Sequence, residues 1–164
     1  MMHSNESAEN YLETILILSQ KLPVVRSVDI ANELGYKKSS ISIAMKNLRE
    51  KNLITVTSAG FIYLTEEGQQ IAEMIYERHQ LLSECLMKLG VNPQTAAADA
   101  CRIEHVLIPE TFEKIKEHYL KQPGIKDSAE YQKLQTIQNF VQTVPGRQDR
   151  DTLPGGRAKD LTPT

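Results

Sequence analysis

The order of elements between residues 28 and 64 constrains the fold more than any other feature of the sequence. Residues 28–34 carry apolar side chains at helical spacing, and Gly35 follows where a helix end favours left-handed backbone. A polar-faced helix comes next. Two runs rich in β-branched and aromatic residues, 53–57 and 61–65, then flank a turn at Ser58-Ala59-Gly60 and predict a hairpin. This order predicts a winged helix-turn-helix.

Helical periodicity accounts for most of the remaining chain. A first helix is expected from Ser7, as its N-cap, to Ser19, and the polar-faced helix is expected to open at Ser39 or Ser40. Further helices are expected over 65–89, 95–105, 109–120 and 128–141. The fold class is therefore mainly α, with three helices and a two-stranded β wing followed by an all-helical domain. The expected domains are 1–64 and 65–143, with a disordered tail over 144–164 that is rich in Pro and Gly.

The charge is unevenly distributed. The 164 residues include 19 Lys and Arg against 21 Asp and Glu, a formal net charge of -2. Residues 21–51 nevertheless hold seven bases against three acids, which gives +4, and the flanking segments are acidic. The short chain has only 2 Cys, which excludes a disulfide scaffold, and no apolar run approaches the roughly 20 residues that span a bilayer. We expect a cytoplasmic protein with no membrane partner, because the N-terminus also lacks signal-peptide features.

The basic block lies on the polar face of the third helix. The expected DNA-contacting residues are Lys37, Lys38, Ser39, Ser40, Ser42, Lys46 and Arg49. The residues that open the helix can reach phosphate or base edges, whereas Lys46 and Arg49 are expected to contact backbone phosphate. Two alternatives stay open at this point: a solvated basic face, and a small α+β domain without a nucleic-acid role.

The segment Cys101-Arg102-Ile103-Glu104-His105 holds the most informative side chains. On a helix, positions i, i+3 and i+4 share a face, so thiol, carboxylate and imidazole converge there. Together they form a ligand set for a transition metal. The alternative is an ordinary amphipathic helix with a buried Cys and a solvated Glu and His. His79 and Glu13 are two further candidate ligands on other helices.

With these residues in hand, the chain resembles the diphtheria toxin repressor family, which includes the manganese transport regulators. The resemblance covers roughly residues 7–121. It is carried by Glu9-Asn10-Tyr11-Leu12-Glu13, the winged helix, Arg78-His79, and Ala100-Cys101-Arg102-Ile103-Glu104-His105-Val106. It implies a homodimeric repressor that binds double-stranded DNA at a pseudo-palindromic operator. It also implies that the all-helical domain is a dimerisation and metal-binding domain, with a metal site that joins it to the first helix.

The resemblance assigns the candidate ligands residue by residue: Glu13, His79, Glu104 and His105 stand at family ligand positions. Cys101 stands where the iron branch has Cys and the manganese branch Glu. Asn10 stands where the manganese branch has Asp and the iron branch Met, so its amide is a weaker candidate ligand. The thiol favours Fe(II), with Mn(II) second and Zn(II) or Co(II) as competitors in vitro.

Two rival functions are open on the sequence alone. The first is a winged-helix regulator switched by a small molecule or by oxidation of the Cys101 thiol. The second is a metalloenzyme with Glu104 as general base, which is disfavoured because the sequence has no nucleotide-binding loop and no nucleophile elbow. We therefore expect a regulator rather than an enzyme.

Overall fold

The computed structural model describes residues 3–123 and residue 132. Its elements are α1 (His3–Lys21), α2 (Ser27–Leu34), α3 (Lys38–Glu50), β1 (Ile54–Val56), β2 (Ile62–Leu64), α4 (Glu66–Lys88), α5 (Pro93–Ile103) and α6 (Pro109–Leu120). Apart from residue 132, the expected helix over 128–141 and the expected tail lie outside the described residues. The fold class is confirmed: helices dominate, and β1 and β2 pair antiparallel with Ile54 opposite Leu64.

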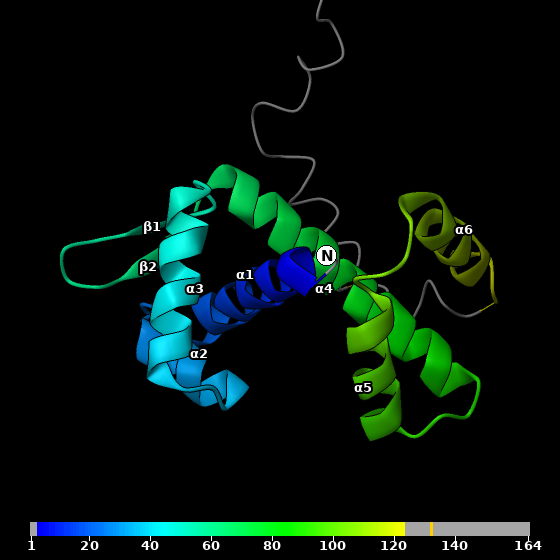
Figure 1. The fold of residues 1–164 in the computed structure, drawn as a ribbon. Coiled ribbons are helices and arrows are strands. Elements are labelled where there is room, and N and C mark those ends of the chain that lie inside the picture. Colours follow the sequence, from blue (N-terminus) through cyan, green and yellow to red (C-terminus); the bar gives the residue numbers. More distant parts are fainter. Residues whose placement is uncertain (1–2, 124–131, 133–164) are drawn as a thin grey trace, which may run out of the picture.

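The N-terminal elements form the winged helix-turn-helix around one apolar core. The core residues come from the first three helices, the wing and the start of α4, and they include Leu12, Ile15, Ile30, Ile41 and Ile62. Gly35 ends α2 with φ 66°, as the sequence predicted. The wing projects away from the helices at one edge of the molecule (Figure 1).

Three helices begin or end at other residues than predicted. The first helix begins at His3, so Ser7 lies inside it and is not its N-cap; residues 3–7 contain no Gly or Pro that would stop it. The third begins at Lys38 after Lys37, which supplies no side-chain cap, instead of at Ser39 or Ser40. The fifth begins at Pro93, because Asn92 caps it by accepting from the Thr95 backbone N–H, and it ends at Ile103.

A tight junction joins the wing to α4. The Thr65 hydroxyl accepts from the Gly68 N–H and donates to the Asn52 carbonyl, and the Thr65 N–H donates to the Leu53 carbonyl. A Cβ on Gly68 would lie 2.0 Å from the Leu53 carbonyl oxygen, so only glycine permits this approach. The start of α4 is thereby held against the DNA-binding domain.

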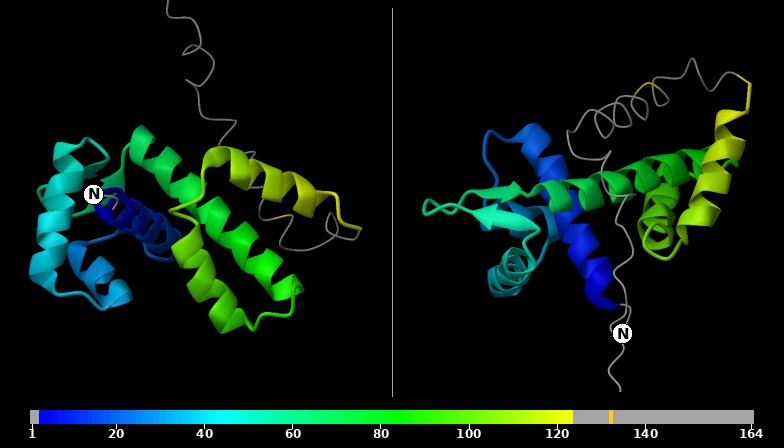
Figure 2. Two further views of the ribbon diagram at one scale, coloured as in Figure 1. Left: turned by 45° about the vertical axis from the view of Figure 1, so that its right-hand side comes forward. Right: turned by 90° about the horizontal axis from the view of Figure 1, so that it is seen from above.

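Helices α4, α5 and α6 form a second helical group, and α4 joins it to the winged helix-turn-helix. Helix α4 packs against α1 at one side and against α5 and α6 further along (Figure 2). Leu81, Phe112 and Tyr119 form a second core there, and Tyr119 donates a hydrogen bond to the buried Glu84. Because one helix belongs to both groups, side chains from α1, α4 and the end of α5 meet where the groups adjoin. No helix in the described part of the chain is long and apolar enough to cross a membrane.

Candidate metal centre

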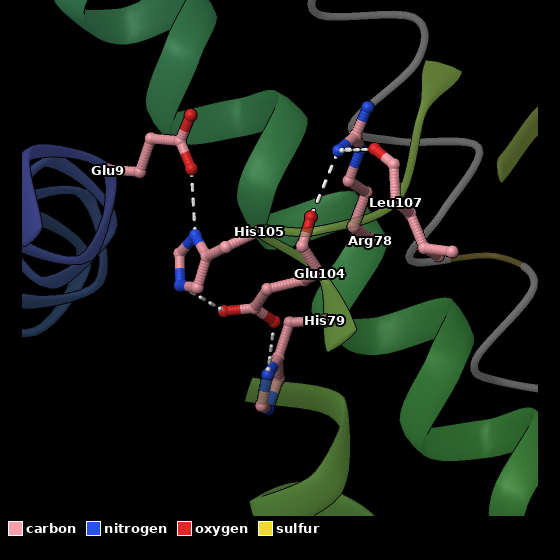
Figure 3. Close-up of polar contacts among 6 residues, drawn as sticks. All are labelled: Glu9, Arg78, His79, Glu104, His105 and Leu107. Atoms are coloured by element: carbon pink, nitrogen blue, oxygen red, sulfur yellow. Dashed lines mark hydrogen bonds and ion pairs between the residues drawn. The ribbon is translucent and has the colours of Figure 1, made fainter. Parts of the chain in front are cut away.

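Three elements bring ionisable side chains to the junction between the two helical groups. Helix α1 carries Glu9, α4 carries His79, and Glu104 and His105 directly follow α5 (Figure 3). Glu13, also on α1, has a ligand atom within 4.8 Å of those of His79 and Glu104. The side chains that Figure 3 shows from these elements point toward one another across the junction.

The end of α5 keeps the spacing that the sequence predicted. Glu104 is the C-cap of the helix and His105 lies in the turn beyond it, so the predicted helix was two residues too long at this end. The backbone of Glu104 nevertheless stays helical, with φ -56° and ψ -32°. The ligand atoms of Cys101, Glu104 and His105 therefore still converge, all within 4.8 Å of one another.

Glu104 is at the centre of the cluster. It is fully buried, and its Oε2 lies 2.8 Å from His79 Nδ1. Its Oε1 lies 3.3 Å from His105 Nε2, but it has no hydrogen bond of good geometry among the described residues. Glu104 also belongs to a second group whose ligand atoms lie within 4.8 Å, formed with Glu13 and His79. A buried carboxylate oxygen without a hydrogen bond is costly, and a cation would satisfy it.

Burial and like charge act on Glu13 in the same direction. Glu13 is buried, and burial together with repulsion from Glu104 raises its pKa from 4.5 to about 7, although His79 and His105 oppose the rise. The hydrogen bond with Glu104 raises the pKa of His79, against the effect of burial. Glu13 and Glu104 therefore repel each other when both are ionised, and a cation bound between them would remove that repulsion.

The thiol of Cys101 lies at the solvent side of this cluster. Cys101 is an exposed residue, yet partial burial of the thiol and the carboxylates of Glu104 and Glu13 raise its pKa. Forming the thiolate therefore costs more here than for a free cysteine, unless a bound cation replaces the proton. Asn10 lies one turn before Glu13 on α1, where its backbone carbonyl accepts from the Thr14 hydroxyl. Among the described residues, no contact places the Asn10 amide in the site.

Two contributing residues were not assigned a role by the sequence analysis. Glu9 Oε2 lies 2.8 Å from His105 Nδ1, with the His105 side chain 3% exposed, so a carboxylate of α1 orients an imidazole that follows α5. The buried Arg78 donates through Nη1 to the carbonyls of Glu104 and Leu107, which fixes the turn after α5. Both residues stand in blocks that carry the resemblance, but a contact between residues 96 positions apart, such as that of Glu9 with His105, leaves no local signal.

The predicted DNA-contacting residues all lie exposed on α3 or directly before it. These residues are Lys37, Lys38, Ser39, Ser40, Ser42, Lys46 and Arg49. The Lys46 ammonium lies 3.9 Å from Glu50, and the Ser42 hydroxyl donates to the Lys38 carbonyl. The basic face is therefore solvent-accessible and lies at the far side of the molecule from α6 (Figure 1). A winged helix joined to a buried carboxylate–imidazole cluster defines a metal-responsive, DNA-binding class of protein.

Comparison with known proteins agrees with that class. Residues 3–59 match the family described as "Iron dependent repressor, N-terminal DNA binding domain", and residues 65–124 match "Iron dependent repressor, metal binding and dimerisation domain". The chain is 32% identical over 114 residues to the transcriptional regulator MntR of Escherichia coli O6:H1, covering 70% of this chain and 74% of that protein. It is 29% identical over 132 residues to MntR of Bacillus subtilis strain 168, covering 80% and 92%.

Solved structures show the same fold. The manganese regulator SloR superposes with a TM-score of 0.62 at 24% identity, over 68% of this chain and 52% of SloR. A manganese-dependent transcriptional repressor in complex with manganese gives 0.62 at 25% identity, over 68% and 51%. The chain thus spans about half the length of these two solved proteins. It belongs to the diphtheria toxin repressor/MntR family of metal-dependent, DNA-binding transcriptional repressors.

The expected preference for Fe(II) over Mn(II) finds no support in these comparisons. Divalent metal binding is a property of the matched family, but the similar proteins include manganese regulators. The prediction rested on the softness of one thiol and left out the other donor atoms near it. The second group of ligand atoms, from Glu13, His79 and Glu104, contains only oxygen and nitrogen donors, which Mn(II) accepts.

Proposed function

We propose that Glu13, His79, Cys101, Glu104 and His105 hold the divalent cation that activates this repressor. The observation that carries the proposal is the state of Glu104: fully buried, shared by both groups of ligand atoms, and with one carboxylate oxygen that lacks a hydrogen bond among the described residues. Asn10 is proposed as a further, weaker oxygen donor, because one helical turn separates it from Glu13.

The chain's own residues supply the coupling between metal and DNA. Glu13 and Glu104 repel each other across the junction between α1 and the end of α5, and this repulsion favours separation of the two helical groups. A bound divalent cation supplies the positive charge that removes the repulsion. The contact between Glu9 and His105 holds α1 against the turn after α5. Since α1 packs in the same domain as α3, the proposed recognition helix, the ligands and α3 are parts of one connected structure. Stronger cation binding in this arrangement than in a loose one shifts the population toward it.

We propose that the DNA-binding form is a homodimer on double-stranded DNA. In a two-fold dimer, the spacing of the two α3 helices must match the half-sites of a pseudo-palindromic operator. Lys37, Lys38, Ser39, Ser40 and Ser42 are proposed to meet the major groove and its edges, with Lys46 and Arg49 on the backbone phosphates. The wing turn, Ser58-Ala59-Gly60, contains no Lys or Arg and therefore adds little electrostatic attraction to the DNA phosphates.

For the cation, we propose Mn(II) and Fe(II) as the activating ions, with Zn(II) and Co(II) as competitors in vitro. Glu13, His79 and Glu104 suit Mn(II), and the manganese regulators among the similar proteins support it. Cys101 offers its Sγ as a softer donor, and for this reason Fe(II) stays in the proposal as a second activating ion.

The test is operator binding by the purified chain, followed by fluorescence anisotropy under anaerobic conditions in chelator, Mn(II), Fe(II) or Zn(II). We expect tight binding only with a metal, and loss of the metal-dependent increment in Glu104→Gln. Glu117→Gln, a change at an exposed carboxylate on α6, is the matched control and should respond like the wild type. Equal affinity in chelator and in all metals would contradict the proposal.

A second variant separates the metal from the thiol. Cys101→Ser keeps an oxygen at the solvent side of the cluster, so we expect it to retain a Mn(II) response. A regulator switched by oxidation of Cys101 would instead respond to oxidant without any metal and would lose that response in Cys101→Ser.

A further inference from the structure

One exposed side chain on α3 is apolar. Ile43 is 64% exposed in the second turn of the helix, whereas the other apolar residues of α3 with large side chains, Ile41, Met45 and Leu48, are buried. Helix propensity gives no reason for isoleucine at this position, since β-branching makes it a poorer helix former than Lys, Glu or Ala. An isoleucine here therefore exposes apolar surface to water, which is unfavourable unless a partner covers it.

The surroundings of Ile43 indicate the nature of that partner. Ser39 lies one turn before it and Lys46 one turn after it on the same face, and both are exposed. Hydroxyl and ammonium groups around an apolar centre fit a partner that presents phosphates beside an apolar group. In Figure 1, α3 lies at the opposite side of the molecule from α5 and α6, so the helices of the dimerisation domain do not cover Ile43.

The side chain of Ile43 carries no hydrogen-bonding group, so at this position the helix can meet a base edge only through an apolar contact. The neighbouring Ser42 hydroxyl donates to the Lys38 carbonyl. In the major groove, the one apolar group on a base edge is the thymine C5-methyl. Because β-branching leaves Ile one preferred χ1 rotamer in a helix, the contact also costs little conformational entropy.

We propose that Ile43 is a specificity-determining residue that contacts a thymine methyl group in each operator half-site. The inference rests on the proposed role of α3 as the recognition helix. The hydroxyl groups of Ser39 and Ser40 add hydrogen bonds to the DNA at the start of the helix, and the basic side chains around them bind the phosphates. Discrimination at the centre of the half-site then depends on an apolar contact and not on a bidentate hydrogen bond.

The test starts with selection of binding sites from random double-stranded DNA by the full chain with Mn(II) present. Each thymine of the selected operator is then replaced in turn by deoxyuridine, which removes only the methyl group. For the wild type, we expect one position per half-site at which this replacement weakens binding about four-fold, which corresponds to about 0.8 kcal/mol for one buried methyl group. In Ile43→Ala, thymine and uracil should bind equally at that position.

Lys46→Ala is the control, because loss of a phosphate contact should weaken both operators equally and leave the thymine-to-uracil ratio unchanged. Circular dichroism and metal titration of Ile43→Ala establish that the variant is folded. If Mn(II) promotes no sequence-selective binding, the proposed function fails and this inference fails with it. If an operator is selected but uracil replaces thymine at no cost, or Ile43→Ala leaves the ratio unchanged, the inference alone is overturned.

Discussion

Glu13 should make the metal-free protein less stable as the pH rises. Its pKa in the folded protein is about 7, against an ordinary value of 4.5, because it is buried and faces Glu104. Below pH 4.5 both the folded and the unfolded chain hold the proton, so the carboxyl has no effect on the free energy of unfolding. Between pH 4.5 and 7 only the folded chain keeps it, and above pH 7 folding forces a charged carboxylate into the site. The free energy of unfolding therefore falls through this window.

The size of the effect follows from the two pKa values. Their difference of about 2.5 corresponds to about 3 kcal/mol at about 1.4 kcal/mol for each pH unit, reached at pH 8. His79 acts in the same direction, because its raised pKa means that stabilisation by its protonated form is lost as the pH rises. A bound cation reverses the slope, since it replaces the proton and binds the deprotonated ligands.

Urea denaturation of the metal-free protein at several pH values between 5 and 8 measures this slope. We expect the wild type to lose up to about 3 kcal/mol across the range and Glu13→Gln to lose much less, because its side chain does not ionise. Glu33→Gln, at an exposed carboxylate on α2, should keep the wild-type slope. With Mn(II) in excess, the wild type should become more stable as the pH rises. Identical slopes for the wild type and Glu13→Gln in chelator would refute the electrostatic account of the site.

Three more predictions follow from contacts at the junction. Glu9→Gln removes the carboxylate that orients His105, so metal affinity measured by calorimetry should fall about 10- to 100-fold while the fold is kept; unchanged affinity would mean that Glu9 has no orienting role. Arg78→Met leaves the Glu104 carbonyl without its charged donor, and thermal unfolding should show a loss of about 2–3 kcal/mol. Cys101→Ser should lower affinity for Zn(II) more than for Mn(II), and a competition titration that found equal losses would argue against the thiol as a ligand.

Local sequence patterns predicted most of the helices and the wing. Gly35 and Gly60 stand at φ 66° and 80° at the helix end and in the wing turn, where the sequence placed left-handed backbone or a turn. Helix starts were predicted less well, because several polar residues before each helix can serve as its first turn. Lys37 precedes α3 without a side-chain cap, so no local signal distinguished it from Ser39 or Ser40.

In the candidate site, too, contacts within one segment were predictable and contacts between distant segments were not. The convergence of Cys101, Glu104 and His105 follows from helical spacing, and it persists because Glu104 keeps helical backbone beyond the end of α5. The bond between Glu9 and His105 joins residues 96 apart, and residues that distant are brought together by packing alone. The metal preference illustrates a further limit, because ligand type at one position does not give the ligands that share the site with it.

The sequence by itself determined the succession of helices and wing, the basic face of α3, and the convergence of Cys101, Glu104 and His105, because these depend on spacing along one segment. Only the tertiary structure decided that Glu104 is fully buried, with one oxygen that has no hydrogen bond in the described part of the chain. It also decided that Glu13 lies close to Glu104, so that burial and repulsion raise the Glu13 pKa to about 7. Desolvation and Coulomb repulsion depend on distance in space and on exclusion of water. Both arise where α1, α4 and the end of α5 pack together, and no single segment contains them.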